Sequence, residues 1–135
     1  MAGPSLAAGV PGWQTRGMRA CVPRPVENQS MARLFTEIDR DMAGWIRRQQ
    51  MFFVASAPLS ADGSINCSPK GLDTLRILGP TEIAWLDLGG SGIETVAHLK
   101  ENGRIVIMFC AFEGSPRILR LHGHGTVIER DHPEF

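Results

Sequence analysis

The sequence predicts a mainly β fold in which antiparallel strands form a small barrel. Two observations favour this class: apolar segments of strand length recur along the chain, and short turn sequences separate them. A chain of 135 residues with 43% hydrophobic content can build one packed domain. We therefore divide it into residues 1–30, a leader, and residues 31–135, one domain.

The leader, residues 1–30, is rich in Gly, Pro, Ala and Ser and shows no periodicity, which predicts disorder. Because it holds more arginine than acid, an organelle transit peptide is one interpretation, although it has neither a convincing amphipathic face nor a continuous apolar core. A start codon assigned too far upstream of Met31 is at least as good an interpretation.

The first ordered element is predicted to be an amphipathic helix. Apolar residues recur every three or four positions from 33 to about 50. A strand follows over 51–59, rich in Phe and Val, and a tight turn is predicted at Asp62-Gly63. The returning strand of this hairpin is expected over 65–68.

A further strand and a short helix are predicted after the hairpin. The strand covers 82–88, and the helix starts at Ser91, whose spacing to Glu94 is that of a capping box. Asn102-Gly103 predicts a left-handed stop at the end of this helix.

Two long strands are predicted at the end of the chain. Residues 104–112 are apolar on both faces, which is typical of a central strand, and residues 117–130 alternate apolar with polar side chains. About five strands would leave one edge of a barrel unpaired. We therefore expect either a truncated protein or a strand supplied by a second subunit.

Composition excludes several classes of function. Lys plus Arg and Asp plus Glu are equal at 14 each, so we expect no nucleic-acid or membrane partner. No apolar run approaches the ~20 residues that span a bilayer. The three cysteines, at positions 21, 67 and 110, are widely spaced, which indicates reduced thiols in a cytoplasmic protein.

Catalytic and metal-binding motifs are also missing. The sequence contains no GxSxG, HExxH, GxGxxG or Walker motif, so a hydrolase or a Rossmann dehydrogenase is not supported. His122 and His124 have a spacing that can hold a metal, but Arg120 shares their face and no third ligand stands out. We therefore predict no metal site.

The segment Ser68-Pro69-Lys70-Gly71 is the first candidate binding site. Proline removes a ladder donor and glycine weakens a strand, so both are costly unless the strand ends or bulges there. A lysine projecting from such a fixed backbone can meet a phosphate as a point charge. The alternative is an ordinary edge turn with a solvated lysine.

The helix start at Ser91 is the second candidate site. Free amides at a helix N-terminus attract anions, and glycines on either side of Ser91 allow close approach of a ligand. The carboxylate of Glu94 already uses part of that field. Arg117, at the turn before the last strand, can reach a phosphate or a flavin carbonyl, or it is a surface charge.

Taken together, the ordered segments resemble the pyridoxamine 5'-phosphate oxidase-like family, which comprises flavin-binding split barrels. The similarity runs from about Met31 to Phe135 and is most specific in SPKGLDT, in ETVAHLKENGR, and in MFCAFEG followed after one residue by PRILRL. It implies an antiparallel six-stranded split barrel with short peripheral helices that binds FMN at the interface of a homodimer.

The resemblance also implies which residues contact FMN. The strand containing Ser68, Pro69, Lys70 and Gly71 would pass beside the isoalloxazine ring and the ribityl chain. A second group would lie toward the phosphate and comprises Leu86, Asp87, Ser91 and Thr95. Arg117 would approach the edge of the flavin.

The sequence departs from the oxidases of this family at two places. Glu94 and Thr95 occupy the positions of an Arg-Lys pair that holds phosphate, and the chain ends before the C-terminal Trp and Arg segment that binds pyridoxal. We therefore expect the N-terminal portion of the domain and do not expect vitamin B6 oxidation.

The function predicted from the resemblance is an FMN-binding oxidoreductase that passes a hydride between a nicotinamide and an unknown small acceptor. Because flavin carries the redox chemistry, few catalytic side chains are needed. The alternatives are a non-catalytic module that binds or stores flavin or haem, a deazaflavin-dependent reductase, and a short product that lacks its closing strand.

Overall fold

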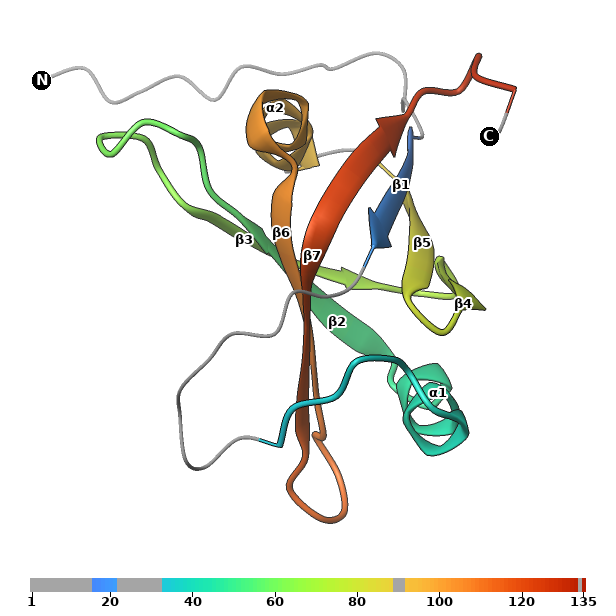
Figure 1. Cartoon of the computed structure of the whole chain (residues 1–135). Coiled ribbons are helices and arrows are strands. Elements are labelled where there is room, and N and C mark those ends of the chain that lie inside the picture. The colour runs from blue at the N-terminus through green and yellow to red at the C-terminus, as the bar shows by residue number, and fades with distance from the viewer. Residues whose placement is uncertain (1–15, 22–32, 89–91, 134) are drawn as a thin grey trace, which may run out of the picture.

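A computed structural model describes residues 16–21, 33–88, 92–133 and 135 (Figure 1). In this part of the chain, seven strands form one sheet in the order β3-β2-β6-β7-β1-β5-β4. Every pairing in the sheet is antiparallel. The strands are β1 (Arg16–Cys21), β2 (Met51–Ser56), β3 (Asn66–Gly71), β4 (Leu75–Gly79), β5 (Glu82–Asp87), β6 (Arg104–Cys110) and β7 (Ile118–Ile128).

Two short helices, α1 (Arg40–Arg47) and α2 (Gly92–Asn102), lie at opposite ends of the sheet (Figure 1). The prediction of a mainly antiparallel β fold with short helices is thus confirmed. The sheet has seven described strands, one more than the six implied by the resemblance. It has two more than the five predicted from the sequence, because β1 and β4 were not predicted. Within the described residues the sheet is not closed, since β3 and β4 are its two end strands.

Strand β1 corrects the expectation that residues 1–30 are entirely disordered. It pairs with β5 on one side and β7 on the other, which makes it an interior strand of the sheet. Its Met18 and Ala20 side chains are each only 1% exposed. The strand forms because its neighbours supply both hydrogen-bonded ladders and an apolar floor, which outweigh its weak intrinsic strand preference. The other residues of 1–30 lie outside the described part of the chain.

Helix α1 is shorter than the periodicity predicted. The carboxylate of Asp39 accepts a hydrogen bond of 2.8 Å from the Met42 amide and caps the helix, so the helix begins only after this residue. Four apolar residues of α1 are buried against the core: Met42, Ala43, Trp45 and Ile46. Of the apolar residues before the cap, Leu34 and Phe35 are exposed, whereas Ile38 is buried in the core.

Helix α2 ends as the sequence predicts. Gly103 adopts a φ of 69°, and its amide bonds the Leu99 carbonyl at 3.1 Å, which confirms the left-handed stop. Ser91, the predicted cap at the other end, lies outside the described residues. No described helix is long and apolar enough to cross a membrane.

The hairpin between β2 and β3 is confirmed, but its connection is longer than a two-residue turn. The strands end at Ser56 and resume at Asn66, and the predicted Asp62-Gly63 turn lies within this loop. The Gly63 amide bonds the Ser60 carbonyl at 3.2 Å. Register is set instead by the buried alternation of β2 and β3, which places Phe52 opposite Lys70.

Candidate functional site

A row of polar side chains lies on the inner face of β3. Strand alternation turns Asn66, Ser68 and Lys70 inward, opposite Ser56, Val54 and Phe52 of β2. Asn66 and Ser68 are 9% and 3% exposed, and the Lys70 side chain is 12% exposed. Because most of the buried side chains of the fold are apolar, buried polar groups here need partners or a ligand.

Lys70 finds its partner on a distant strand. Its ammonium group lies 3.2 Å from Oδ1 and 3.1 Å from Oδ2 of Asp87, at the end of β5. The Asp87 side chain is only 4% exposed, so the ion pair is buried. The pair joins β3, one end strand of the sheet, to β5, which is next to the other end strand. Lys70 is therefore neither solvated nor an isolated positive charge.

The Asp87 carboxylate also touches the start of α2. A methyl group added at Gly92 would overlap this carboxylate. The close approach is possible because glycine has no side chain. Asp87 thus connects β3, β5 and the first turn of α2, where negative charge is favoured by the helix dipole.

Two buried hydrogen bonds fix α2 to the β2–β3 hairpin. Asn66 donates to the Thr95 hydroxyl at 2.8 Å, and Ser56 Oγ lies 2.9 Å from His98 Nδ1. Thr95 is 1% exposed. Ser56, Asn66 and His98 were not predicted as site residues. Ser56 and Asn66 could have been found from the sequence, because they are polar at strand positions where the alternation predicts buried, apolar side chains.

Two buried polar atoms have no hydrogen-bond partner among the described residues: Ser68 Oγ and Trp85 Nε1. Ser68 lies on β3 between Asn66 and Lys70, both of which are bonded. A buried hydroxyl without a partner costs about 1–3 kcal/mol, so such a group is a candidate for contact with a ligand.

The predicted cofactor residues therefore fall into two groups. The structure brings together Ser68, Lys70, Asp87 and Thr95 on the inner side of β3, β5 and α2. Outside this cluster, Pro69 and Leu86 are exposed and Gly71 ends β3. Ser91 lies outside the described residues.

Arg117 does not join the inner cluster. It forms an ion pair of 3.0 Å with Asp41 of α1, and its guanidinium lies over the Trp45 ring at 4.8 Å from the centroid. It borders a hollow of about 650 Å³ between α1 and the β6–β7 turn. The other residues of this hollow are Trp45, Arg48, Gln49, Gln50, Phe112, Glu113, Ser115 and Pro116.

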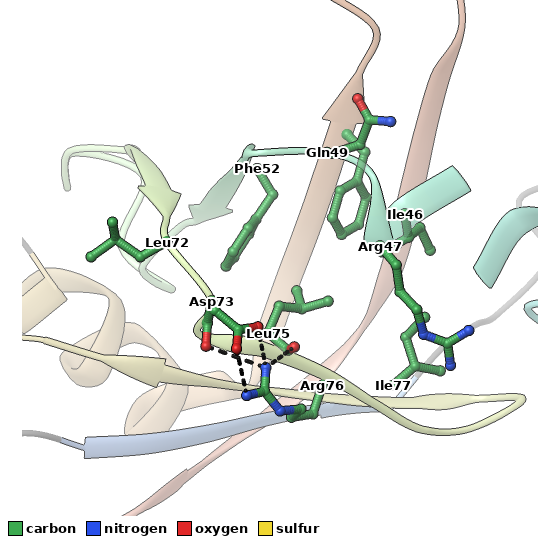
Figure 2. A pocket seen from close by; sticks show the side chains of 10 residues that line it. Ile46, Arg47, Gln49, Phe52, Leu72, Asp73, Leu75, Arg76 and Ile77 are labelled. Atoms are coloured by element: carbon green, nitrogen blue, oxygen red, sulfur yellow. Dashed lines mark hydrogen bonds and ion pairs between the residues drawn. The ribbon is translucent and has the colours of Figure 1, made fainter. Parts of the chain in front are cut away.

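A second pocket, of about 380 Å³, lies between the end of α1 and the turn that joins β3 to β4 (Figure 2). None of the predicted cofactor residues lines it. Its lining residues are Ile46, Arg47, Gln49, Phe52, Leu72, Asp73, Leu75, Arg76, Ile77 and Phe109.

Comparison with known proteins supplies the family. The chain is 44% identical over 103 residues to the pyridoxamine 5'-phosphate oxidase family protein ustO of Aspergillus flavus. The alignment covers 75% of this chain. The chain belongs to the pyridoxamine 5'-phosphate oxidase-like family. The resemblance inferred from the sequence motifs is thereby confirmed, and the antiparallel sheet agrees with it.

This member of the pyridoxamine 5'-phosphate oxidase-like family corresponds to only part of that relative. The chain spans 41% of the relative's length. No family model matches the chain, and no solved structure matches it.

Proposed function

We propose that the chain binds FMN and forms part of a flavin-dependent oxidoreductase that transfers a hydride between a nicotinamide and a small acceptor. The observation that supports this most is the unpartnered Ser68 hydroxyl beside the Lys70–Asp87 pair, on a buried polar face in a chain of this family. A folded chain keeps a buried hydroxyl unpaired at a cost, which a bound cofactor would remove.

The residues of this face fit the polar edge of a flavin ring. Ser68 offers a free hydroxyl, and the Lys70 ammonium has three donors, of which the Asp87 carboxylate engages two at most. When bound, FMN supplies the redox chemistry itself. The protein would orient the ring, exclude water, and offer the Ser68 hydroxyl and the Lys70 ammonium as hydrogen-bonding groups at the edge of the ring.

The same geometry favours one of the two roles considered for Lys70. Because Asp87 compensates its charge, Lys70 contributes little net attraction for a phosphate dianion. We therefore assign Lys70 and Ser68 to the ring rather than to the phosphate.

We also propose a homodimer, formed through the outward face of the sheet. Two rows of side chains cross this face: Pro69, Phe53 and Met108 form one, and Cys67, Ala55 and Val106 form the other. Pro69 and Cys67 are exposed, and the other four are half-buried. An apolar strip of this kind on an end strand and its neighbours is suited to a second copy of the chain.

The visible spectrum of the freshly purified protein tests the cofactor proposal, together with mass spectrometry of whatever is released on denaturation. We expect FMN at about one per subunit, as for a preformed cofactor site. A haem spectrum would identify haem as the cofactor instead of FMN, and a deazaflavin mass would identify a deazaflavin. Colourless protein that cannot be reconstituted with FMN would contradict the proposal.

Oxidation of a reduced nicotinamide by the loaded protein tests the enzymatic part. We expect absorbance at the nicotinamide band to fall upon mixing with catalytic amounts of protein under air. Bound flavin without any turnover, with several acceptors supplied, would favour a binding or storage module instead.

A further inference from the structure

We propose that the pocket of Figure 2 binds a small aromatic carboxylate, with Arg47 as its counter-ion. The pocket is separate from the polar face assigned to FMN, because it is lined by none of those residues. Its volume of about 380 Å³ is within the range of small-ligand sites. The proposal does not depend on flavin binding.

The floor of the pocket is apolar and partly aromatic. Phe52 and Phe109 are 4% and 1% exposed, and their ring centroids lie 5.8 Å apart at an interplanar angle of 33°. Phe52 also meets Trp85 edge-on at 6.4 Å. The remaining apolar side chains that line the wall are Ile46, Leu72, Leu75 and Ile77. A flat apolar body can extend this aromatic packing.

The polar lining residues other than Arg47 already have partners. Arg76 forms a forked pair with Asp73, at 2.7 Å from Nη1 to Oδ1 and 3.1 Å from Nη2 to Oδ2. Gln49 donates its side-chain amide to the Trp45 carbonyl at 2.9 Å. Figure 2 shows the Asp73–Arg76 pair below Leu75, and Arg47 extending separately beside Ile77.

Arg47 is therefore the lining residue that can add a charged contact. Among the described residues, no carboxylate pairs with it, and its side chain is exposed at the end of α1. A guanidinium fits a carboxylate through two parallel hydrogen bonds. Because the charges of Asp73 and Arg76 cancel, Arg47 leaves the pocket lining with one net positive charge. One carboxylate group would neutralise it.

The turn between β3 and β4 forms the side of the pocket opposite α1, and its backbone conformation is unusual. Leu72 has a φ of 62°, which is uncommon for a bulky residue, and its side chain is exposed. The Thr74 hydroxyl donates to the Gly71 carbonyl at 2.9 Å and closes this turn. The turn places Asp73 where it can fix Arg76 against the pocket.

Binding of 2-naphthoate, with 2-naphthalenemethanol as its neutral counterpart, tests the proposal on the purified full chain with its natural cofactor content. Titration calorimetry gives the affinities, and amide shifts in NMR spectra locate the site. We expect naphthoate to bind more tightly than the alcohol, with shifts at Phe52, Leu75 and Ile77. Excess FMN should not displace it.

Arg47→Gln should weaken naphthoate binding roughly tenfold, the loss expected for a charged hydrogen-bonded contact, and leave the alcohol unchanged. Arg48→Gln is the matched control, because Arg48 is the next residue and lies outside this pocket. The proposal is overturned if naphthoate does not bind the wild-type chain, if Arg47→Gln binds it equally well, or if the shifts map elsewhere. Any of these results would leave the FMN proposal unaffected.

Discussion

Lys70 and Asp87 form a buried ion pair across the open side of the sheet, with the ammonium nitrogen 3.1 and 3.2 Å from the two carboxylate oxygens. Their strands are separated by four others in the sheet order, so no ladder hydrogen bond links them. The pair is one contact between the two sides of the curled sheet, and the edge-on packing of Phe52 against Trp85 is another.

Replacing Lys70 by Met should destabilise the fold by about 3 kcal/mol, because Asp87 would remain as a buried charge without its cation. Urea unfolding of the apoprotein measures this loss. Arg76→Met is the control, since its pair with Asp73 is exposed and should contribute less than about 1 kcal/mol. Equal losses in the two variants would show that the Lys70 pair is not buried in solution.

The same Lys70→Met variant should also retain FMN less well, by roughly 1–3 kcal/mol, if the ammonium group contacts the ring. Fluorescence titration with FMN, at a temperature where the variant remains folded, gives the affinity. An unchanged dissociation constant would remove Lys70 from the cofactor site and leave it only its structural role.

Ser68→Ala and Ser56→Ala form a matched pair of changes on neighbouring strands. Removing the unpartnered Ser68 hydroxyl should leave the apoprotein as stable or more stable, whereas removing the Ser56 hydroxyl, which is bonded to His98, should cost about 1–3 kcal/mol. Thermal unfolding of both apoproteins checks the contrast. FMN affinity should show the opposite contrast: Ser68→Ala should bind FMN more weakly, and Ser56→Ala should bind it normally. If Ser68→Ala binds FMN normally, its hydroxyl is not a cofactor ligand.

Gly103→Ala should destabilise the chain by about 1–2 kcal/mol, because a φ of 69° disfavours a side chain and the added methyl would lie 2.7 Å from His124 Nδ1. Gly79→Ala is the control, since nothing lies within 4 Å of a methyl group there. Urea midpoints of the two variants give the comparison. Equal midpoints would be inconsistent with the helix stop described above.

Phe53→Asp should weaken a dimer formed through the outward face by at least about 2 kcal/mol, as for a central apolar contact. Sedimentation velocity over a range of concentrations measures this. Leu59→Asp, in the exposed loop after β2, is the control and should not alter the association. A protein that is monomeric before any substitution would exclude the dimer proposal.

Several local features followed from the sequence because their causes lie within a few residues. Asn102-Gly103 marks a helix stop through the conformational freedom of glycine, and the apolar run of β6 marks a central strand through burial on both faces. The position of Lys70 between proline and glycine also indicated a special strand end. These local rules were enough to identify the fold class and to single out Lys70.

The sequence by itself determined the approximate positions of five of the seven described strands, the stop of α2 and the resemblance to the family. Only the tertiary structure decided that β1 becomes an interior strand, that Asp87 neutralises Lys70, and that Ser68 is buried without a partner. The physical reason is that pairing and burial depend on residues far apart in the chain. Lys70 and Asp87 meet only because the whole sheet curls, and no local pattern records that curvature.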